Sequence, residues 1–203
     1  MSFKSEFENF YAHQFGIAEL SPPVFDKFPM CVRFNIGDSS IENEQKYIET
    51  AILRAQTVFN DLFNINDGIY LIVDSCEKFK DFYTGDCDAI SPVRKCVSNQ
   101  LDEYCYEKLL RTYDDTAEEC PYSRYIIESS VNSLNTNALI SQIINSELGG
   151  YYCLSDSVYI INKNSGVLYF LYNDAGLDVV SADKYLLESI SIKFAKWVSA
   201  SKL

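Results

Sequence analysis

The sequence of 203 residues has one histidine, eight glycines and five prolines, and it lacks any long run of hydrophobic residues. Because every Ser-His-Asp or Cys-His site would have to use His13, histidine-based catalysis has little scope. Neither a Gly-x-Ser-x-Gly nucleophile elbow nor a glycine-rich phosphate loop occurs. The low glycine and proline content also excludes collagen-like and low-complexity chains. We therefore interpret His13 as a structural residue.

Segments long enough to cross a membrane as a helix are absent from the sequence. Its longest apolar stretches, such as residues 69–73, have the length of a strand, whereas a membrane span needs about 18 apolar residues or more. Residues 1–6 are polar, and no apolar region of a signal peptide follows them. We therefore expect a cytoplasmic protein that has no membrane partner.

The seven cysteines form no Cys-x-x-Cys pair, and their number is odd. They are Cys31, Cys76, Cys87, Cys96, Cys105, Cys120 and Cys153. A secreted disulfide framework favours an even count in a smaller chain. A tetrahedral zinc site would need four thiolates from distant positions, because only one histidine is present. We therefore expect free thiols, no metal site and no cofactor.

The composition is that of an ordinary soluble globular protein, with 47% hydrophobic and 23% charged residues. The length suits one domain with its own core. The chain carries 17 basic and 29 acidic residues, which give a net charge of −12. This acidic excess disfavours nucleic acid as a partner and favours a basic protein.

The pattern of hydrophobic residues predicts helix, strand, helix and strand in the first third of the chain. An aromatic face predicts a helix over residues 3–15. A strand at 31–36 is followed by a helix, which Ser39 and Glu42 begin with the spacing of a capping box, and then by a buried strand at 69–73. This order indicates a βαβ unit with a right-handed crossover.

The remainder of the chain predicts an acidic excursion over residues 74–120 and an antiparallel meander near the C-terminus. Within the excursion, Ser98 begins a predicted helix whose apolar stripe is Leu101, Tyr104, Cys105 and Leu109. Further strands are predicted at 124–128, 157–161, 167–172 and 177–180, and further helices at 134–148 and 183–199. We predict a single α+β domain over residues 1–203, with a mixed sheet of about five or six strands and helices packed on that sheet.

Two segments combine unusual residues in a fixed order. The first is Val-Arg-Phe-Asn-Ile-Gly at 32–37, with Tyr47, Arg54 and Ala55 on the following helix. The second is Leu-Tyr-Asn-Asp-Ala-Gly-Leu-Asp-Val-Val at 171–180, with Trp197 after it. They resemble a family of uncharacterised bacterial domains of unknown function, whose members carry an RFELG strand and an LYDDRGCDVIA hairpin. The resemblance covers about residues 30–75 and 157–198.

The resemblance implies a shared fold and no mechanism. The family's Arg in the hairpin is Ala175 here, and its Cys is Leu177, so any role of that Arg is absent. Small, variable bacterial domains of this kind are often found among the immunity proteins of toxin systems. That association is not chemistry, and function has to be argued from a site.

The predicted hairpin contains Asp174 and Asp178, and Asp156 lies nearby in the sequence. Such carboxylates can act as a general acid and base or bind a hard cation. The alternative is turn chemistry, in which an Asp side chain accepts backbone N–H groups and Gly176 supplies a positive φ. We favour turn chemistry, because a cation site needs more oxygen ligands than this hairpin has.

The acidic middle of the chain is its most distinctive surface feature. Residues 102–119 contain seven acidic and two basic residues, a net charge of −5, with tyrosines among them. Tyrosines anchor protein interfaces and charges steer association, so we predict a partner-binding surface. Its residues are Asp81, Tyr83, Asp86, Asp88, Asp102, Glu103, Tyr106, Tyr113, Asp114, Asp115, Glu118 and Glu119. The alternative is a solvated face that keeps the protein soluble.

These observations predict a non-enzymatic protein-binding domain. Its most concrete form is an immunity-type inhibitor that neutralises a basic, nuclease-like bacterial toxin through the acidic, tyrosine-containing surface. Two alternatives stay open: a hydrolase that uses the hairpin carboxylates, and a regulatory subunit.

Overall fold

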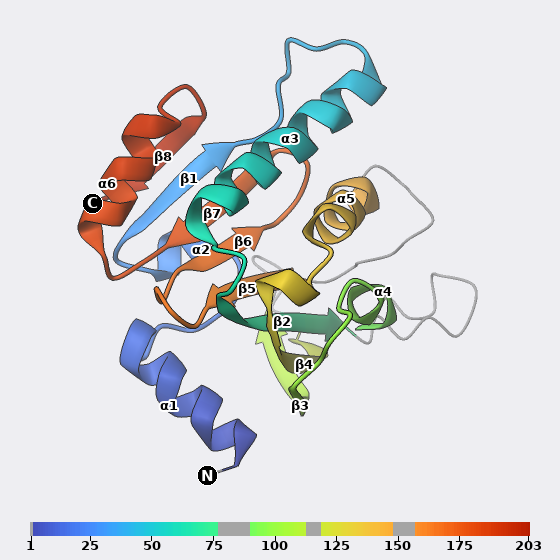
Figure 1. Ribbon diagram of the computed structural model, residues 1–203, viewed down its shortest axis with the longest axis vertical. Helices are drawn as coiled ribbons and strands as arrows, with labels where there is room; N and C mark the ends of the chain where they lie inside the picture. The colour runs from blue at the N-terminus through green and yellow to red at the C-terminus, as the bar shows by residue number, and fades with distance from the viewer. Residues whose placement is uncertain (1, 77–89, 113–118, 148–156) are drawn as a thin grey trace.

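A computed structural model describes residues 2–76, 90–112, 119–147 and 157–203. In this part of the chain, eight strands form one sheet in the order β3-β4-β2-β5-β6-β7-β1-β8, and all neighbouring strands are antiparallel (Figure 1). The strands are β1 (Cys31–Asn35), β2 (Gly68–Cys76), β3 (Asp102–Thr112), β4 (Glu119–Ser130), β5 (Ser157–Asn162), β6 (Leu168–Leu171), β7 (Gly176–Val180) and β8 (Val198–Lys202). The helices are α1 (Phe3–Phe15), α2 (Val24–Lys27), α3 (Glu44–Leu62), α4 (Ile90–Lys95), α5 (Thr136–Glu147) and α6 (Lys184–Lys193), with a 3-10 turn at Val131–Ser133.

The α+β class and the C-terminal meander are confirmed. The predicted sheet had too few strands, and it was predicted to be mixed whereas the observed strand pairs are all antiparallel. Strands β1 and β2 do not pair with each other, because β5, β6 and β7 lie between them. Four antiparallel steps separate β1 from β2, so the two strands still run in the same direction. The strand-helix-strand order is therefore correct, but the meander is inserted into the expected βαβ unit.

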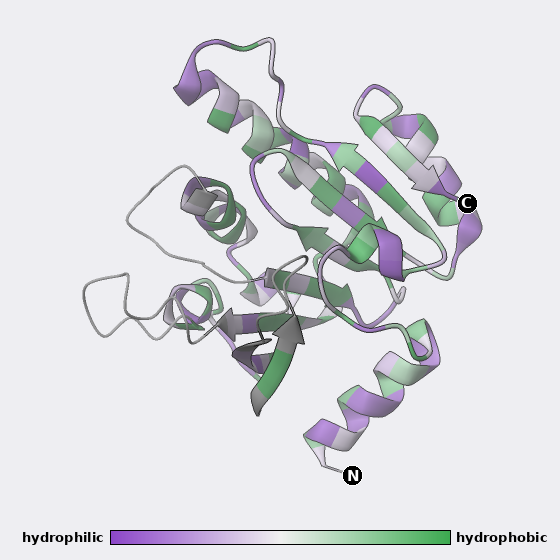
Figure 2. Cartoon of the chain, turned by 180° about the vertical axis from the view of Figure 1, so that it is seen from behind, coloured by the Kyte–Doolittle hydropathy of each residue, from purple (hydrophilic) through white to green (hydrophobic). Residues whose placement is uncertain are grey.

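Alternate residues of the strands divide the core between the two faces of the sheet. On β2, Ile69, Leu71 and Val73 belong to the cluster under α3 and α5, whereas Tyr70 and Ile72 belong to the cluster under α1 and α2. Figure 2 shows hydrophobic residues concentrated on the strands. We refer to the two sides as the α3 face and the α1 face.

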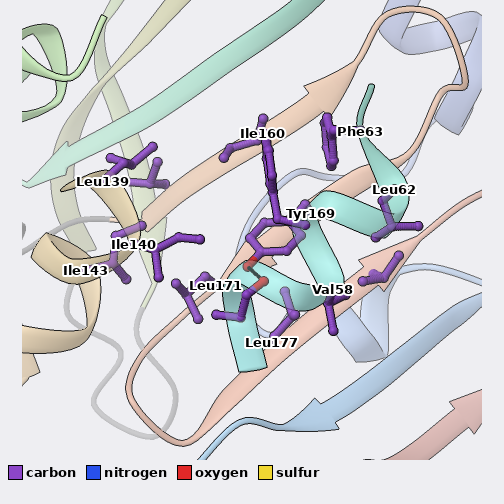
Figure 3. Packing of buried hydrophobic residues seen from close by; sticks show 14 of the residues in the cluster. Val58, Leu62, Phe63, Leu139, Ile140, Ile143, Ile160, Tyr169, Leu171 and Leu177 are labelled. Atoms are coloured by element: carbon purple, nitrogen blue, oxygen red, sulfur yellow. Dashed lines mark hydrogen bonds between the residues drawn. The ribbon is translucent and has the colours of Figure 1, made fainter. Parts of the chain in front are cut away.

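The α3 face holds the larger core. Helix α3 buries one stripe, formed by Ala51, Ala55, Val58, Phe59 and Leu62. The Tyr169 hydroxyl of β6 points into this core and donates to the carbonyl of Ala55 at 3.0 Å (Figure 3). The buried phenol is therefore satisfied by a helix carbonyl, which fixes α3 over the meander.

The α1 face is rich in aromatic residues. The Tyr70 ring of β2 contacts the rings of Phe3, Phe7 and Phe10 at centroid distances of 5.1 to 6.2 Å. Helix α1 spans the predicted residues 3–15, and its C-cap Gly16 has a φ of 66° that glycine adopts without strain. No helix among the described residues is long and apolar enough to span a membrane.

Helix α3 begins later than the capping box predicted. The side chain of Asn43, and not that of Ser39, accepts the capping N–H, which is donated by Lys46 at 2.9 Å. The Asp38 carboxylate instead accepts the N–H of Ser40 at 3.2 Å. This hydrogen bond stabilises a turn at the position where the capping box predicted the start of the helix.

The helix predicted after Ser98 is wrong, because this segment is the edge strand β3. Residues 102–106 pair in regular register with β4, from Asp102 opposite Glu128 to Tyr106 opposite Arg124. The apolar spacing fits a helix, but pairing with the long strand β4 satisfies the backbone groups and overrides that local signal.

The last predicted helix is too long, since α6 ends at Lys193 and the edge strand β8 follows it. The C-cap of α6 is Phe194, whose ring stacks on Trp197 at a centroid distance of 5.2 Å. Trp197 therefore lies in the turn before β8, where stacking terminates the helix and returns the chain to β1.

Candidate functional site

Asp178, one of the two hairpin carboxylates, is locked in a buried ion pair. It lies on β7 with no exposed surface and accepts two hydrogen bonds from Arg33, at 2.7 and 2.9 Å. The backbone N–H of Phe25 donates to the same carboxylate at 3.1 Å. The hydrogen bonds that Arg33 donates to Asp178 also raise the pKa of Arg33, so the guanidinium stays charged.

Asp174, the other hairpin carboxylate, points toward a different helix. It accepts a hydrogen bond from the Tyr47 hydroxyl of α3 at 2.7 Å. Burial and this hydrogen bond raise the pKa of Tyr47 to about 12. Asp174 therefore faces α3, whereas Asp178 faces α2 on the other side of the sheet. The hairpin does not bring the two carboxylates to one face, and Asp156 lies outside the described residues.

Turn chemistry is present in the hairpin, but Asn173 performs it. The Asn173 side chain accepts the N–H groups of Ala175 at 2.9 Å and of Gly176 at 3.0 Å. Gly176 is needed for space: a Cβ there would lie 1.7 Å from the hydroxyl oxygen of Tyr172. The prediction that Asp174 caps the turn is therefore wrong. The prediction of a positive φ at Gly176 is wrong as well.

The residues of the two unusual segments converge around β1. Arg54 of α3 donates to the carbonyl of Gly37 at 3.1 Å and to Asp38 at 2.7 Å, and it lies 5.5 Å from the centre of the Trp197 ring. A Cβ at Gly37 would lie 2.3 Å from the Tyr47 hydroxyl, so glycine is required there. These contacts fasten the end of β1 to α3 and to the turn before β8, and they explain the segments structurally.

The predicted partner-binding surface is only partly within the described residues. Outside them lie Asp81, Tyr83, Asp86, Asp88, Tyr113, Asp114, Asp115 and Glu118. Within them, Asp102, Glu103 and Tyr106 lie on β3, and Glu119 begins β4. The described part of the acidic middle is therefore a hairpin at the edge of the sheet, not a loop or a helix.

The tyrosines of β3 rest against α1. The Tyr106 hydroxyl donates to Glu8 at 2.9 Å, and burial together with this contact raises the pKa of Tyr106. The rings of Tyr104 and Tyr106 meet edge to face at 4.8 Å, with the Lys4 ammonium about 5 Å from each ring centre. Tyr104 was assigned to the apolar stripe of the predicted helix, but its spacing of two from Tyr106 fits a shared strand face.

Glu103 points to the opposite side of β3. It forms an ion pair with Arg94 of α4 and accepts a hydrogen bond from Gln100 at 2.9 Å. Asp102, by contrast, is exposed. The edge strand thus has the ordered tyrosines and Asp102 on one face and the paired Glu103 on the other.

Metal and thiol chemistry find little support among the described residues. They contain no group of three or more His, Cys, Asp and Glu side chains that could hold a metal ion. Burial raises the pKa of the Cys31 and Cys96 thiols, which makes both poor nucleophiles. His13 is exposed on α1, and Cys87 lies outside the described residues.

Comparisons with known proteins agree with the resemblance found in the sequence. The model of a family described as "Domain of unknown function (DUF3885)" matches residues 7–202, including the acidic middle. The chain is also similar to "Uncharacterized protein YnaE" of Bacillus subtilis (strain 168), with 23% identity over 207 residues that cover 93% of this chain and 95% of that protein. No solved structure gives a significant match.

Proposed function

The chain belongs to the DUF3885 family, and we propose that it is a non-enzymatic, protein-binding domain. One observation carries the proposal: the described part of the acidic, tyrosine-containing middle of the chain forms β3, at one edge of the sheet, and the beginning of its neighbour β4. Charged groups at such an edge accelerate the approach of a basic partner, and fixed aromatic rings then slow its dissociation.

The most concrete form of this function is immunity to a toxin. A cytoplasmic inhibitor of this kind would bind a basic, nuclease-like bacterial toxin and occlude its active site or substrate path. The acidic surface would take the place of the nucleic acid's phosphates, which a nuclease attracts with basic residues. A regulatory subunit that binds a basic protein would use the same surface.

The competing hydrolase would use Asp174 and Asp178. It gains no support from their positions, because each carboxylate has its own partner and they lie on opposite faces of the sheet. A screen against phosphoester, ester, glycoside and peptide substrates should show no turnover above background. Turnover that Asp174→Asn abolishes would contradict the binding function.

Charge reversal tests the proposed surface. Replacing Asp114, Asp115, Glu118 and Glu119 by lysine should abolish recovery of a basic partner when the tagged chain is used for affinity purification from its own host. A matched control reverses Asp26, Glu42, Glu44 and Glu49, which are exposed and distant in sequence from the hairpin. It changes the net charge equally and should keep the partner.

Association kinetics then separate the effect of the charges on the association rate from the effect of the tyrosine on the dissociation rate. At low salt, the hairpin reversal should slow association with the recovered partner at least tenfold, and the difference should shrink at high salt because screening weakens steering. Tyr113→Ala should mainly speed dissociation. An unchanged association rate at low salt would show that the acidic residues do not steer the partner and only keep the protein soluble.

A further inference from the structure

The guanidinium of Arg33 is fixed in place but uses only part of its hydrogen-bonding capacity. Asp178 accepts from Nε at 2.7 Å and from Nη2 at 2.9 Å, so the carboxylate occupies one side of the planar group. Both N–H groups of Nη1 and the second N–H of Nη2 remain. No residue in the part of the chain that the structure describes accepts them, and the side chain is 29% exposed. Nη1 and Nη2 together therefore form a second, open fork.

Two aromatic rings line the same guanidinium. Its central carbon lies 4.8 Å from the centre of the Phe25 ring on α2 and 5.5 Å from the centre of the Tyr172 ring, which follows β6. Both rings are partly exposed, so each has surface left for a further contact. The rings and Asp178 order Arg33 in advance, and a ligand would not have to restrict this side chain on binding.

The strand beside Arg33 leaves space at the open fork. Ala200 of β8 lies directly opposite Arg33 in the register, so its side chain shares the α1 face. Asn35 follows Arg33 by two residues on β1 and lies on the same face. Asn35 is exposed and Ala200 is partly exposed. The guanidinium is thus bordered by a small neutral side chain and by an amide that can donate a hydrogen bond.

Lys202 adds positive charge at this place. Its ammonium lies 4.8 Å from the centre of the Phe25 ring, which also contacts Arg33. It donates to the backbone carbonyls of Phe25 at 2.6 Å and of Asp26 at 3.3 Å rather than to a carboxylate. Asp178 balances only one of the two cations. The group therefore keeps a positive charge in a chain whose net charge is −12, and it favours an anion over a neutral ligand.

We propose that the open fork of Arg33 binds an oxyanion, a carboxylate or a phosphate, that is carried on an apolar group. Two oxygen atoms of such an anion match the two nitrogens of the fork, and the rings of Phe25 and Tyr172 contact the apolar group. The site lies on β1 and β8, at the opposite end of the sheet order from β3. It is independent of the proposed protein-binding surface.

Titration of the protein with three small probes tests the site. Phenyl phosphate and benzoate carry the two kinds of oxyanion on the same ring, and benzamide is the neutral counterpart of benzoate. We expect at least one anion to give saturable shifts in the amide NMR signals of residues 33–35, 172–176 and 199–201, and to bind at least tenfold more tightly than benzamide. The tighter anion identifies the ligand class. No saturable shift at these residues with either anion, or equal binding of benzamide, would overturn the proposal.

A carboxylate introduced beside the fork should compete with the ligand. Ala200→Glu places an acid opposite Arg33 and should weaken binding of the anion at least tenfold. Ser201→Glu is the matched control, because it changes the charge equally but lies opposite Val32, which belongs to the core of the α3 face. It should weaken binding less than threefold. Equal losses in the two variants would show a general effect of charge and contradict a defined site.

Replacement of the arginine tests the fork itself. Arg33→Lys keeps the positive charge but removes the planar pair of donors, so binding should again weaken at least tenfold. The control Arg54→Lys changes an arginine that also pairs with an aspartate, Asp38, and should leave binding unchanged. Thermal unfolding confirms that each variant is folded. If Arg33→Lys does not fold, the comparison of Ala200→Glu with Ser201→Glu decides. Unchanged binding in folded Arg33→Lys would overturn the proposal.

Discussion

At the scale of single residues, the buried ion pair between Arg33 and Asp178 has the clearest physical role. Its geometry is bidentate, Asp178 is fully buried, and the Arg33 guanidinium also lies 4.8 Å from the Phe25 ring centre. The two hydrogen bonds between the guanidinium and the buried carboxylate are charge-assisted, and removing one partner would leave the other without its counter-charge. Asp178 also accepts the backbone N–H of Phe25 and so fixes α2 to the sheet.

Replacing Asp178 tests that role. Asp178→Asn should lower the free energy of unfolding by about 2 to 3 kcal/mol, because Arg33 would lose its partner while its side chain is only partly exposed. The control Asp174→Asn keeps an acceptor for Tyr47 and should cost less than about 1 kcal/mol. Urea denaturation of both variants measures the difference. Equal stabilities would show that the Asp178 pair contributes nothing to the fold.

At the scale of elements, α1 depends on its aromatic face. Phe7 is 6% exposed and meets Tyr70 edge to face at 5.1 Å, whereas His13 on the same helix is exposed. The same helix also supports β3 through Tyr106 and Glu8. Damage to α1 packing should therefore reach the proposed binding edge as well as the core.

Two substitutions on α1 compare the contributions of a buried ring and of an exposed histidine to stability. Phe7→Ala should lower the free energy of unfolding by about 3 kcal/mol, since it removes a buried ring and leaves a cavity. His13→Ala should change it by less than about 0.5 kcal/mol, as is usual for an exposed side chain. Thermal or urea unfolding gives both values. A large loss of stability in the histidine variant would contradict the exposed position of His13.

At the scale of the whole molecule, folding buries several tyrosine hydroxyls and raises their pKa values. Burial is the largest cause of a raised pKa for Tyr11, Tyr47, Tyr70, Tyr106, Tyr169 and Tyr172. The folded chain therefore holds protons above pH 10 that the unfolded chain releases. Stability is complete below pH 10 and falls as the pH rises above it.

The Tyr47 hydroxyl contributes to this loss between pH 10 and about pH 12, where its folded pKa lies. Tyr47→Phe should therefore make the free energy of unfolding fall less steeply over that range. The control Tyr185→Phe replaces a ring that is 83% exposed and should leave the slope unchanged. Urea titrations at several pH values decide the matter, and equal slopes in all three proteins would refute the contribution of Tyr47.

The thiols give a second test on the whole chain. Cys31 and Cys96 are free thiols in the described part of the structure. We expect all seven cysteines to titrate as thiols in denaturant without reductant, as the odd count predicts. Buried Cys31 and Cys96 should react only after unfolding. A total of three or fewer would mean structural disulfides.

Local pattern in the sequence determined the helices α1, α3 and α5 and the strands β1, β2 and β5 to β7. The physical reason is that an apolar face repeats every 3.6 or every 2 residues within one segment, and a stop such as Gly16 acts on its own neighbours. The acidic, tyrosine-containing middle was visible for the same reason, because charge is counted without knowing the fold.

Only the tertiary structure decided the pairing of the strands. The insertion of the meander between β1 and β2, the strand β3 in place of a helix, and the edge strand β8 all depend on partners far away in sequence. The separation of Asp174 from Asp178 has the same origin, since Tyr47 and Arg33 approach the hairpin from opposite faces. A backbone group or a charge takes the partner that folding brings to it, and the local sequence does not contain that partner.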